Sequence, residues 1–117
     1  MIRMARVYEP PGKSEGWRVL VDRLWPRGLT KEAAHVDEWM KEIAPSDALR
    51  KWFGHKPERW ADFQKRYRSE LRKKKNLIGS LRKMERKHGT ITLLFGANDK
   101  EHNQAVVLCN LLRRKLE

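Results

Sequence analysis

The chain has only one cysteine, Cys109, among its 117 residues, so no disulfide can form within it. A chain without internal disulfides is typical of a reducing compartment, and we expect a cytoplasmic location. No run of residues approaches the roughly 18 apolar side chains that a membrane span requires. Residues 1–6 also lack the apolar segment of a secretory signal. We therefore expect no membrane partner.

The sequence motifs of several large enzyme classes are missing. The chain contains no Gly-x-x-x-x-Gly-Lys-Ser/Thr, no Gly-x-Gly-x-x-Gly and no Gly-x-Ser-x-Gly. It also lacks dense metal-ligand spacings such as His-x-x-x-His or Cys-x-x-Cys. These absences argue against the common nucleotide-binding, serine-hydrolase and structural-metal classes. They leave the cofactor undetermined, and we expect no metal.

Acidic side chains are few compared with basic ones: 15 Asp and Glu stand against 27 Lys and Arg, which gives a net charge of +12. The excess is concentrated in residues 59–88, which hold 12 basic and 3 acidic side chains. Such a field favours polyanionic partners, including nucleic acid and nucleotides. A thermally robust surface rich in Lys, Arg and Glu explains the same numbers, so both interpretations stay open.

Hydrophobic patterning predicts one α/β domain over residues 1–117. Apolar runs predict strands at 2–8, 17–22 and 91–95. Amphipathic patterns predict about five helices, at 31–43, 46–54, 57–75, 77–88 and about 100–114. The long helical crossover between the second and third strands favours their parallel pairing. The first two strands are either antiparallel or not adjacent, because the loop between them is short. We expect a short, mixed, mainly parallel sheet.

Helical spacing also assigns the buried faces of these helices. In the expected 31–43 helix, the apolar face consists of Val36, Trp39, Met40 and Ile43. In the helix after Pro57, it consists of Trp60, Phe63, Tyr67 and Leu71. Cys109 lies between apolar neighbours on the last helix, which predicts a core thiol rather than a nucleophile.

The most informative stretch is 19–28, in which an apolar strand ends in Asp22-Arg23 and a tight turn follows. Ionisable side chains at the end of a strand occupy the position where open α/β sheets keep their sites. A second polar group, Asp99, His102 and Asn103, follows the third strand. If the two strands are parallel neighbours, both groups meet at one edge of the sheet. Carboxylate, imidazole and guanidinium groups there suit proton transfer beside an anionic substrate.

The same residues also have structural explanations. In this interpretation Asp22 forms a buried ion pair with an arginine and Asp99 is the N-cap of a helix. His102 then forms a hydrogen bond in the first turn of that helix. Among the aromatic residues, Trp25 and Trp52 suit stacking on a base or sugar. A lid of aromatic side chains packed over the sheet edge is the alternative.

Several longer motifs are shared with a known family. They comprise residues 19–28, Ala44-Pro45-Ser46, residues 49–55, Trp60, Phe63, Arg66-Tyr67, Glu70-Leu71, residues 92–99, His102-Asn103 and Ala105. On these residues the chain resembles, over nearly its whole length, the YeaO-like family of uncharacterised bacterial and archaeal proteins, a domain-of-unknown-function family (number 488). The resemblance implies the fold class and the location of the site, and it implies no particular activity.

Wider relatives of that family carry an Asp-x-Arg motif after a strand and a Cys-His-Arg motif near the position of His102-Asn103. This chain lacks that cysteine and that arginine, so thiol chemistry is not transferred to it. Arg50, His55 and Arg66 are polar positions within the family motifs. The resemblance implies that Arg50 and His55 join the site if the short helix folds back over the sheet edge.

The leading hypothesis is a small enzyme that acts on an anionic substrate: a nucleotide, nucleic acid or phosphorylated molecule. Asp22 would be the general base or an orienting group, and His102 the acid or base positioned by Asp99. The expected substrate-binding residues are Arg23, Trp25, Arg27, Arg50, His55 and Asn103.

The alternative hypothesis is a nucleic-acid-binding protein without catalysis, in which Asp22 and His102 are structural. Its contacts would come from the basic 59–88 region, through Lys65, Arg66, Arg72, Lys73, Lys74 and Lys75. A partner-binding module whose charge serves only solubility is a third interpretation. The oligomeric state stays open.

Overall fold

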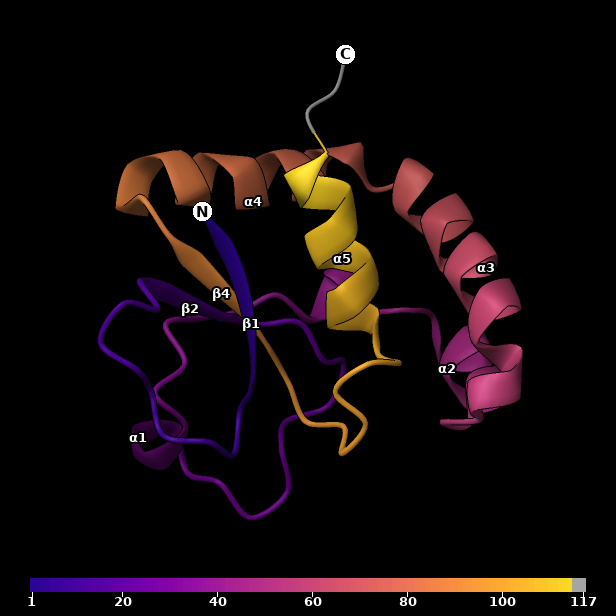
Figure 1. The fold of residues 1–117 in the computed structure, drawn as a ribbon, viewed down its shortest axis with the longest axis horizontal. Coiled ribbons are helices and arrows are strands. Elements are labelled where there is room, and N and C mark those ends of the chain that lie inside the picture. The colour runs from indigo at the N-terminus through magenta and orange to yellow at the C-terminus, as the bar shows by residue number, and fades with distance from the viewer. Residues whose placement is uncertain (115–117) are drawn as a thin grey trace.

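The computed structural model describes residues 1–114, which form a single sheet with helices around it (Figure 1). The strands are β1 (Ile2–Arg6), β2 (Trp17–Leu20), β3 (Glu38–Trp39) and β4 (Ile91–Phe95). The α-helices are α1 (Lys31–Ala34), α2 (Asp47–Phe53), α3 (Trp60–Arg72), α4 (Lys75–His88) and α5 (Gln104–Arg113). The α/β class with a mainly parallel sheet and about five helices is confirmed. Among these residues no helix is long and apolar enough to cross a membrane.

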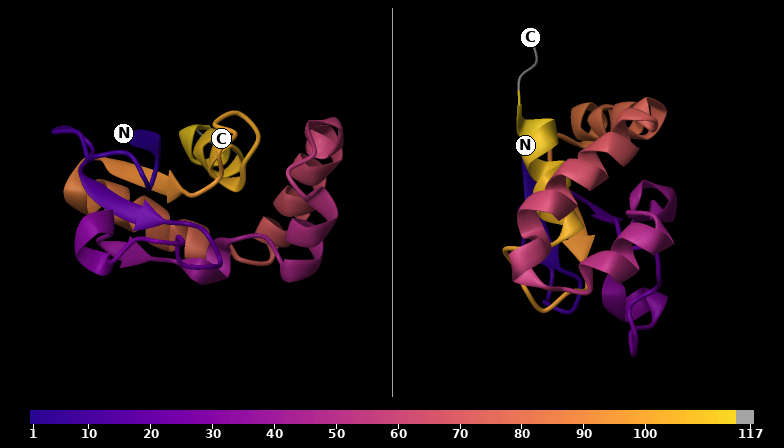
Figure 2. Two further views of the ribbon diagram at one scale, coloured as in Figure 1. Left: turned by 90° about the horizontal axis from the view of Figure 1, so that it is seen from below. Right: turned by 90° about the vertical axis from the view of Figure 1, so that its right-hand side faces the viewer.

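The strand order is β1-β4-β2-β3, so β4 lies between the first two strands. Its five residues are all buried, as expected for a strand covered on both faces. Each of the three strand pairings is parallel, so the described part of the chain has none of the antiparallel pairing expected of a mixed sheet. Figure 2 shows β2 and β4 running side by side in the same direction. The first two strands are therefore not adjacent, which was one of the two predicted arrangements.

The two faces of the sheet are covered unequally. Val19 and Val21 of β2 belong to the main core, which also contains Leu93 of β4 and the buried residues of α2 to α5. Alternate strand residues such as Leu20 and Leu94 face a smaller cluster, which includes Ala34 of α1. Figure 1 shows α3, α4 and α5 grouped together and α1 set apart from them. The second face is thus closed by one short helix and by loops.

Arg18 anchors this thinly covered face. Its side chain is buried, and its guanidinium donates to the carbonyl oxygens of His35 at 2.8 Å and Ala34 at 3.1 Å. It also pairs with the carboxylate of Glu15. Because a buried guanidinium requires partners for its N–H groups, these bonds fix the end of α1 to the sheet. The preceding Gly16 has a φ of 66°, and it packs directly against the backbone of Thr90.

The predicted 31–43 helix is wrong. Thr30 does cap a helix, since its hydroxyl accepts from Ala33 N at 3.1 Å, but that helix ends at Ala34, with His35 at a φ of 50°. The chain then forms β3 and a 3-10 turn at Lys41–Ile43. The apolar residues of this segment serve opposite faces of the sheet, because Val36 packs in the smaller cluster and Ile43 in the main core.

The first two strands end two residues earlier than predicted, at Arg6 and Leu20, and two helix boundaries also differ from the prediction. Residues 73–74 form the bend between α3 and α4, so Lys73-Lys74-Lys75 do not form the last turns of one helix. Figure 1 shows this sharp bend. The last helix begins at Gln104 rather than near Lys100, because Asn103 caps it by accepting from Val106 N at 3.2 Å. The helices at 46–54 and 77–88 and the strand at 91–95 form close to their predicted bounds.

The main core contains one buried hydroxyl with an essential partner. Tyr67 is fully buried, and its hydroxyl donates to the carbonyl oxygen of Ile43 at 2.6 Å. We expect Tyr67→Phe to lower the free energy of unfolding by about 1–2 kcal/mol, because a buried carbonyl loses its donor. Tyr8→Phe is the matched control, since the Tyr8 hydroxyl bonds to Arg27 O at an exposed site. Urea denaturation of both variants measures the difference, and equal losses would contradict the role of burial.

Candidate functional site

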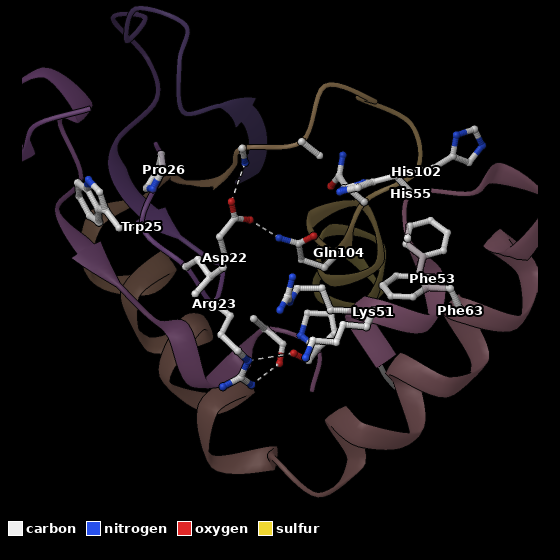
Figure 3. A pocket seen from close by; sticks show the side chains of 18 of the residues that line it. Asp22, Arg23, Trp25, Pro26, Lys51, Phe53, His55, Phe63, His102 and Gln104 are labelled. Atoms are coloured by element: carbon white, nitrogen blue, oxygen red, sulfur yellow. Dashed lines mark hydrogen bonds between the residues drawn. The ribbon is translucent and has the colours of Figure 1, made fainter. Parts of the chain in front are cut away.

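A cavity of about 530 Å³ lies where β2 and β4 end. Figure 3 shows the side chains around it, which come from the segment after β2, from α2 and α3, from the segment between β4 and α5, and from the first residue of α5. Its lining consists of residues 22–27, 44, 45, 50, 51, 53–55, 63, 96, 97 and 102–104. The volume falls within the range of small-molecule sites. This cavity lies at the edge of the sheet where the sequence predicts a site.

Asp22 occupies the centre of this site and is held from two sides. One carboxylate oxygen accepts from Gly96 N at 2.8 Å, and the other accepts from the side-chain amide of Gln104 (Figure 3). A Cβ at position 96 would lie 2.9 Å from Asp22 Oδ2, the oxygen that accepts from Gly96 N, so any other residue there would displace the carboxylate. The partners are therefore an amide and a backbone N–H, and not the arginine of the predicted ion pair.

The environment of Asp22 changes its acidity. Burial raises the pKa of Asp22 above its ordinary value, because water is withdrawn from the charged form. Three smaller influences lower the pKa of Asp22 without cancelling this rise: the hydrogen bonds from Gly96 and Gln104 and the nearby His55. Asp22 is thus a half-buried carboxylate that holds its proton more readily than an exposed one.

Arg23 is engaged in holding the chain rather than projecting freely into the cavity. Its guanidinium donates to the carbonyl oxygens of Pro45 at 3.1 Å and Ala44 at 3.3 Å (Figure 3). Lys74 donates from the far side to Glu42 O at 2.7 Å and to Ala44 O at 3.2 Å. Burial is the main cause that lowers the pKa of Lys74. Arg23, which was expected to bind substrate, and Lys74, which the alternative hypothesis assigned to nucleic acid, thus both fix the segment before α2.

The start of α2 is fixed by a carboxylate on α3. Glu70 accepts from Ser46 N at 2.8 Å and from the Ser46 hydroxyl at 2.6 Å, while that hydroxyl caps α2 by accepting from Leu49 N. The helix ends at Gly54, whose φ of 53° is the left-handed conformation typical of a C-cap. His55 follows with a φ of 57°. This short, doubly fixed helix brings its polar side chains to the cavity.

The α2 side of the cavity carries both charge and an aromatic wall. Arg50 is half-exposed and pairs with Asp47 at 3.0 Å. Lys51 is exposed, and its side chain has neither an ion pair nor a hydrogen bond among residues 1–114; the same holds for the side chain of Arg27. Phe53 stacks on Phe63 of α3, with ring centroids 4.3 Å apart. The lining therefore combines accessible cations with a rigid apolar surface.

His102 belongs to a hydrogen-bonded pair next to the cavity. Its Nδ1 lies 2.8 Å from a carboxylate oxygen of Asp99, and its ring meets Trp60 edge to face, with centroids 5.2 Å apart. Asp99 lies outside the lining and accepts from the backbone N–H groups of Glu101 and His102. The bond from Glu101 N is the main cause that lowers the pKa of Asp99, followed by the bond to His102. This pairing leaves Nε2 of His102 available for another partner.

The remaining predicted residues have mainly structural contacts. Asn103 is buried, and its side chain caps α5 and donates to Asp99 O at 3.0 Å, so it has little freedom to bind a ligand. Trp25 lines the cavity, but its indole N–H donates to Leu29 O at 2.7 Å and its ring meets Trp39 edge to face. Trp52 is not part of the lining. The packed aromatic lid accounts for Trp25 better than stacking on a base.

The cavity brings together eight of the nine residues predicted for the catalytic and substrate-binding set. They are Asp22, Arg23, Trp25, Arg27, Arg50, His55, His102 and Asn103. Sequence reasoning missed Lys51 and Gln104. The parallel register of β2 and β4 could have indicated Gln104. It places Gly96 beside Asp22, so the helix that follows β4 begins close to the Asp22 carboxylate. Among residues 1–114, no three His, Cys, Asp or Glu side chains gather closely enough to hold a metal.

The basic residues that the alternative hypothesis assigned to nucleic acid differ in their exposure and in their contacts. Lys65, Arg72, Lys73 and Lys75 are exposed. The guanidinium of Arg66 lies 4.2 Å from the centre of the Trp52 ring, and Lys74 is turned toward the backbone before α2.

The fold and the cavity identify a class of small α/β domain with a polar site at the carboxyl edge of its sheet. The family model described as the inactive DUF488-N3 subclade matches residues 1–117. The uncharacterized protein YeaO of Escherichia coli K12 is 42% identical over 112 residues, which are 96% of each chain. The uncharacterized protein Rv3073c of Mycobacterium tuberculosis H37Rv is 40% identical over 111 residues, 95% of this chain and 92% of that protein. No solved structure matches significantly. The chain belongs to the YeaO-like DUF488 family.

Proposed function

We propose that this protein binds an anionic small molecule in the cavity at the carboxyl edge of the sheet and holds it without chemical turnover. The observation that supports this proposal most is the charge of the lining. It contains four Lys and Arg side chains and two imidazoles against one carboxylate, Asp22, within the part of the chain that the structure describes. Cations beside a partly apolar cavity favour phosphate or carboxylate groups.

The positions of the cations support a ligand that spans the cavity. Arg27 lies in the segment that follows β2 and Lys51 lies in α2, and neither side chain has an ion pair or a hydrogen bond among residues 1–114. The wall of Phe53 and Phe63 offers an apolar surface to the uncharged part of such a ligand. A nucleotide or a phosphorylated metabolite combines both requirements.

Binding without turnover agrees with three observations. The subclade whose model matches the chain is described as inactive. The lining contains no Ser, Thr or Cys side chain in the described region, and Cys109 is buried on α5. Both carboxylate oxygens of Asp22 already accept a hydrogen bond. The lining therefore lacks a hydroxyl or thiol nucleophile, and in this proposal the central carboxylate serves as a fixed part of the site.

Enzymatic turnover is the second candidate, and the geometry of His102 favours it. With Asp99 holding Nδ1 at 2.8 Å, the other ring nitrogen is oriented to accept or donate a proton. In this proposal Asp22 orients the substrate, and Arg27 and Lys51 bind its anionic group. Slow consumption of a bound ligand, followed by NMR, would support it if His102→Ala abolished that consumption and Lys31→Ala did not.

We expect a ligand of this class to raise the melting temperature of the wild-type protein. At a concentration 100 times its Kd, it stabilises the fold by about 2.7 kcal/mol, which corresponds to about 10 °C or more for a domain of this size. The double variant Arg27→Gln/Lys51→Gln should lose most of this shift, because it removes the two cations without partners. The measurement is a thermal-shift screen with nucleoside mono-, di- and triphosphates, sugar phosphates and dicarboxylates.

The control is Lys13→Gln/Lys31→Gln, which removes the same charge from two exposed residues outside the cavity. It should keep the full shift. The proposal would be wrong if no anion in the screen stabilised the wild type, or if the two double variants lost the shift equally.

We also propose a cytoplasmic location, which is supported by the single buried cysteine.

A further inference from the structure

The outward face of α4 carries a row of cations that the cavity does not use. Lys75, Lys83 and Arg86 recur at i, i+8 and i+11, which places them on one side of the helix, away from the buried Leu81. The row extends along about 16 Å of helix axis. All three side chains are exposed, and in residues 1–114 none has an ion pair or a side-chain hydrogen bond. We call these three residues the α4 row.

No negative charge within α4 compensates the row. The only acidic residue of the helix is Glu85, which is half-buried and turned toward the N-terminus of the chain. Its carboxylate lies 2.6 Å from the ammonium group of Met1. The positive field of the row therefore extends into solvent, where it attracts polyanions.

A glycine in the middle of this face has no explanation within the chain. Gly79 lies between Lys75 and Lys83 on the same side of α4. A Cβ at this position would meet no atom within 4 Å, and its φ is not in the left-handed region. Glycine inside a helix lowers helix stability, so packing and backbone conformation both favour alanine here. What glycine provides is a flat patch at which another molecule's backbone can approach the helix.

Double-stranded nucleic acid has the chemistry that fits these features together. A duplex carries one negative charge per about 1.7 Å of its axis, so a row of about 16 Å faces several phosphates. We propose that α4 binds the phosphate backbone of double-stranded nucleic acid through the α4 row, with Gly79 at the point of closest approach. Lys74 is excluded from this surface, because its ammonium group binds the carbonyl oxygens of Glu42 and Ala44.

The test is fluorescence anisotropy with labelled 20-base-pair DNA and RNA duplexes at 50 and 200 mM salt. Three phosphate contacts predict a slope of about −2.7 in log K against log salt, which is about a 40-fold loss across this range. Lys83→Glu/Arg86→Glu should weaken binding at least tenfold. Lys13→Glu/Lys31→Glu, with the same change in net charge, should stay within about threefold. Both changes are at exposed positions, and melting curves verify that each variant folds.

Equal losses in the two charge-reversed variants would overturn the proposal, because the net charge alone would then explain binding. Absence of wild-type binding at 50 mM salt would overturn it as well. Gly79→Gln adds bulk at the flat patch and should weaken binding severalfold in a folded protein; unchanged affinity would refute the close approach. Arg27→Gln/Lys51→Gln should bind the duplex as the wild type does. A loss there would assign the duplex to the cavity instead.

Discussion

Replacing Gly16 by alanine is expected to destabilise the fold by about 3 kcal/mol or more. Gly16 has a φ of 66°, and left-handed backbone costs an ordinary residue about 1–2 kcal/mol. The added Cβ would also lie 2.1 Å from Thr90 O and 2.8 Å from Thr90 C. Both atoms belong to the backbone directly before β4, and Trp17 N donates to the same oxygen at 3.0 Å. Relief of the clash must therefore shift the start of β2 away from β4, and overpacking of this kind adds about 1–3 kcal/mol.

Gly28→Ala separates these two contributions. Gly28 has a φ of 82°, but a Cβ there would meet nothing within 4 Å. This variant should lose only the conformational part, about 1–2 kcal/mol. Urea denaturation of both variants measures the free energies of unfolding. Similar losses in the two variants would show that the contact with Thr90 contributes nothing.

Asp22 is expected to respond very differently to its two simplest substitutions. Asp22→Ala leaves the N–H of Gly96 and the amide of Gln104 without an acceptor, which should cost about 1–3 kcal/mol for each buried group. Asp22→Asn keeps both bonds if the Gln104 amide turns by 180°, because Asn then accepts from Gly96 N and donates to Gln104. At neutral pH we expect Asp22→Asn to be at least as stable as the wild type, since it removes a carboxylate whose ionisation is opposed by burial.

The pH dependence gives this prediction a definite sign. Because the pKa of Asp22 is raised in the folded state, the native protein binds more protons than the unfolded chain between the ordinary value of 3.8 and the raised value. The contribution of Asp22 to stability therefore falls as pH rises through this interval. The stability of Asp22→Asn relative to the wild type should increase over the same interval and stay constant above it. Urea denaturation at a series of pH values measures this difference.

Asp99→Asn provides a control with the opposite sign. The pKa of Asp99 is lowered, so its stabilising contribution is present above the ordinary value of 3.8 and is lost as pH falls through the lowered one. The wild type should therefore exceed Asp99→Asn in stability near neutral pH, and this advantage should disappear in acid. If Asp22→Asn showed the same pH trend as Asp99→Asn, burial would raise the pKa of Asp22 by less than its hydrogen bonds lower it.

The location of the site was predictable because it follows from strand direction. Once β2 and β4 are parallel neighbours, Asp22 and the segment that contains His102 must meet at one edge of the sheet. The sequence also showed where α2 begins and ends, since Ser46 and Gly54 are strong capping residues. These conclusions depend on local chemistry and on the buried character of the strands, both of which are visible in the sequence.

The errors concern residues whose role depends on distant partners. Val36, Met40 and Ile43 have helical spacing, but the sheet has two faces that need apolar side chains, and the chain crosses from one to the other within eight residues. The role of Arg23 depends on the carbonyl oxygens of Pro45 and Ala44, which only the folded chain brings near it. A basic side chain in a turn does not reveal from the sequence whether it binds a ligand or the backbone of its own chain.

The central position of β4 has a consequence for the order in which the chain assembles. The strands β1 and β2 are both made early, yet each pairs with β4, which follows about 70 residues after β2. During synthesis, the only strand pair within the first 90 residues is the short one between β2 and β3. The main core also requires side chains of α5, near the end of the described chain. Folding is therefore expected to wait until the C-terminal quarter of the protein has left the ribosome, and a truncation after α4 should yield a chain without its sheet.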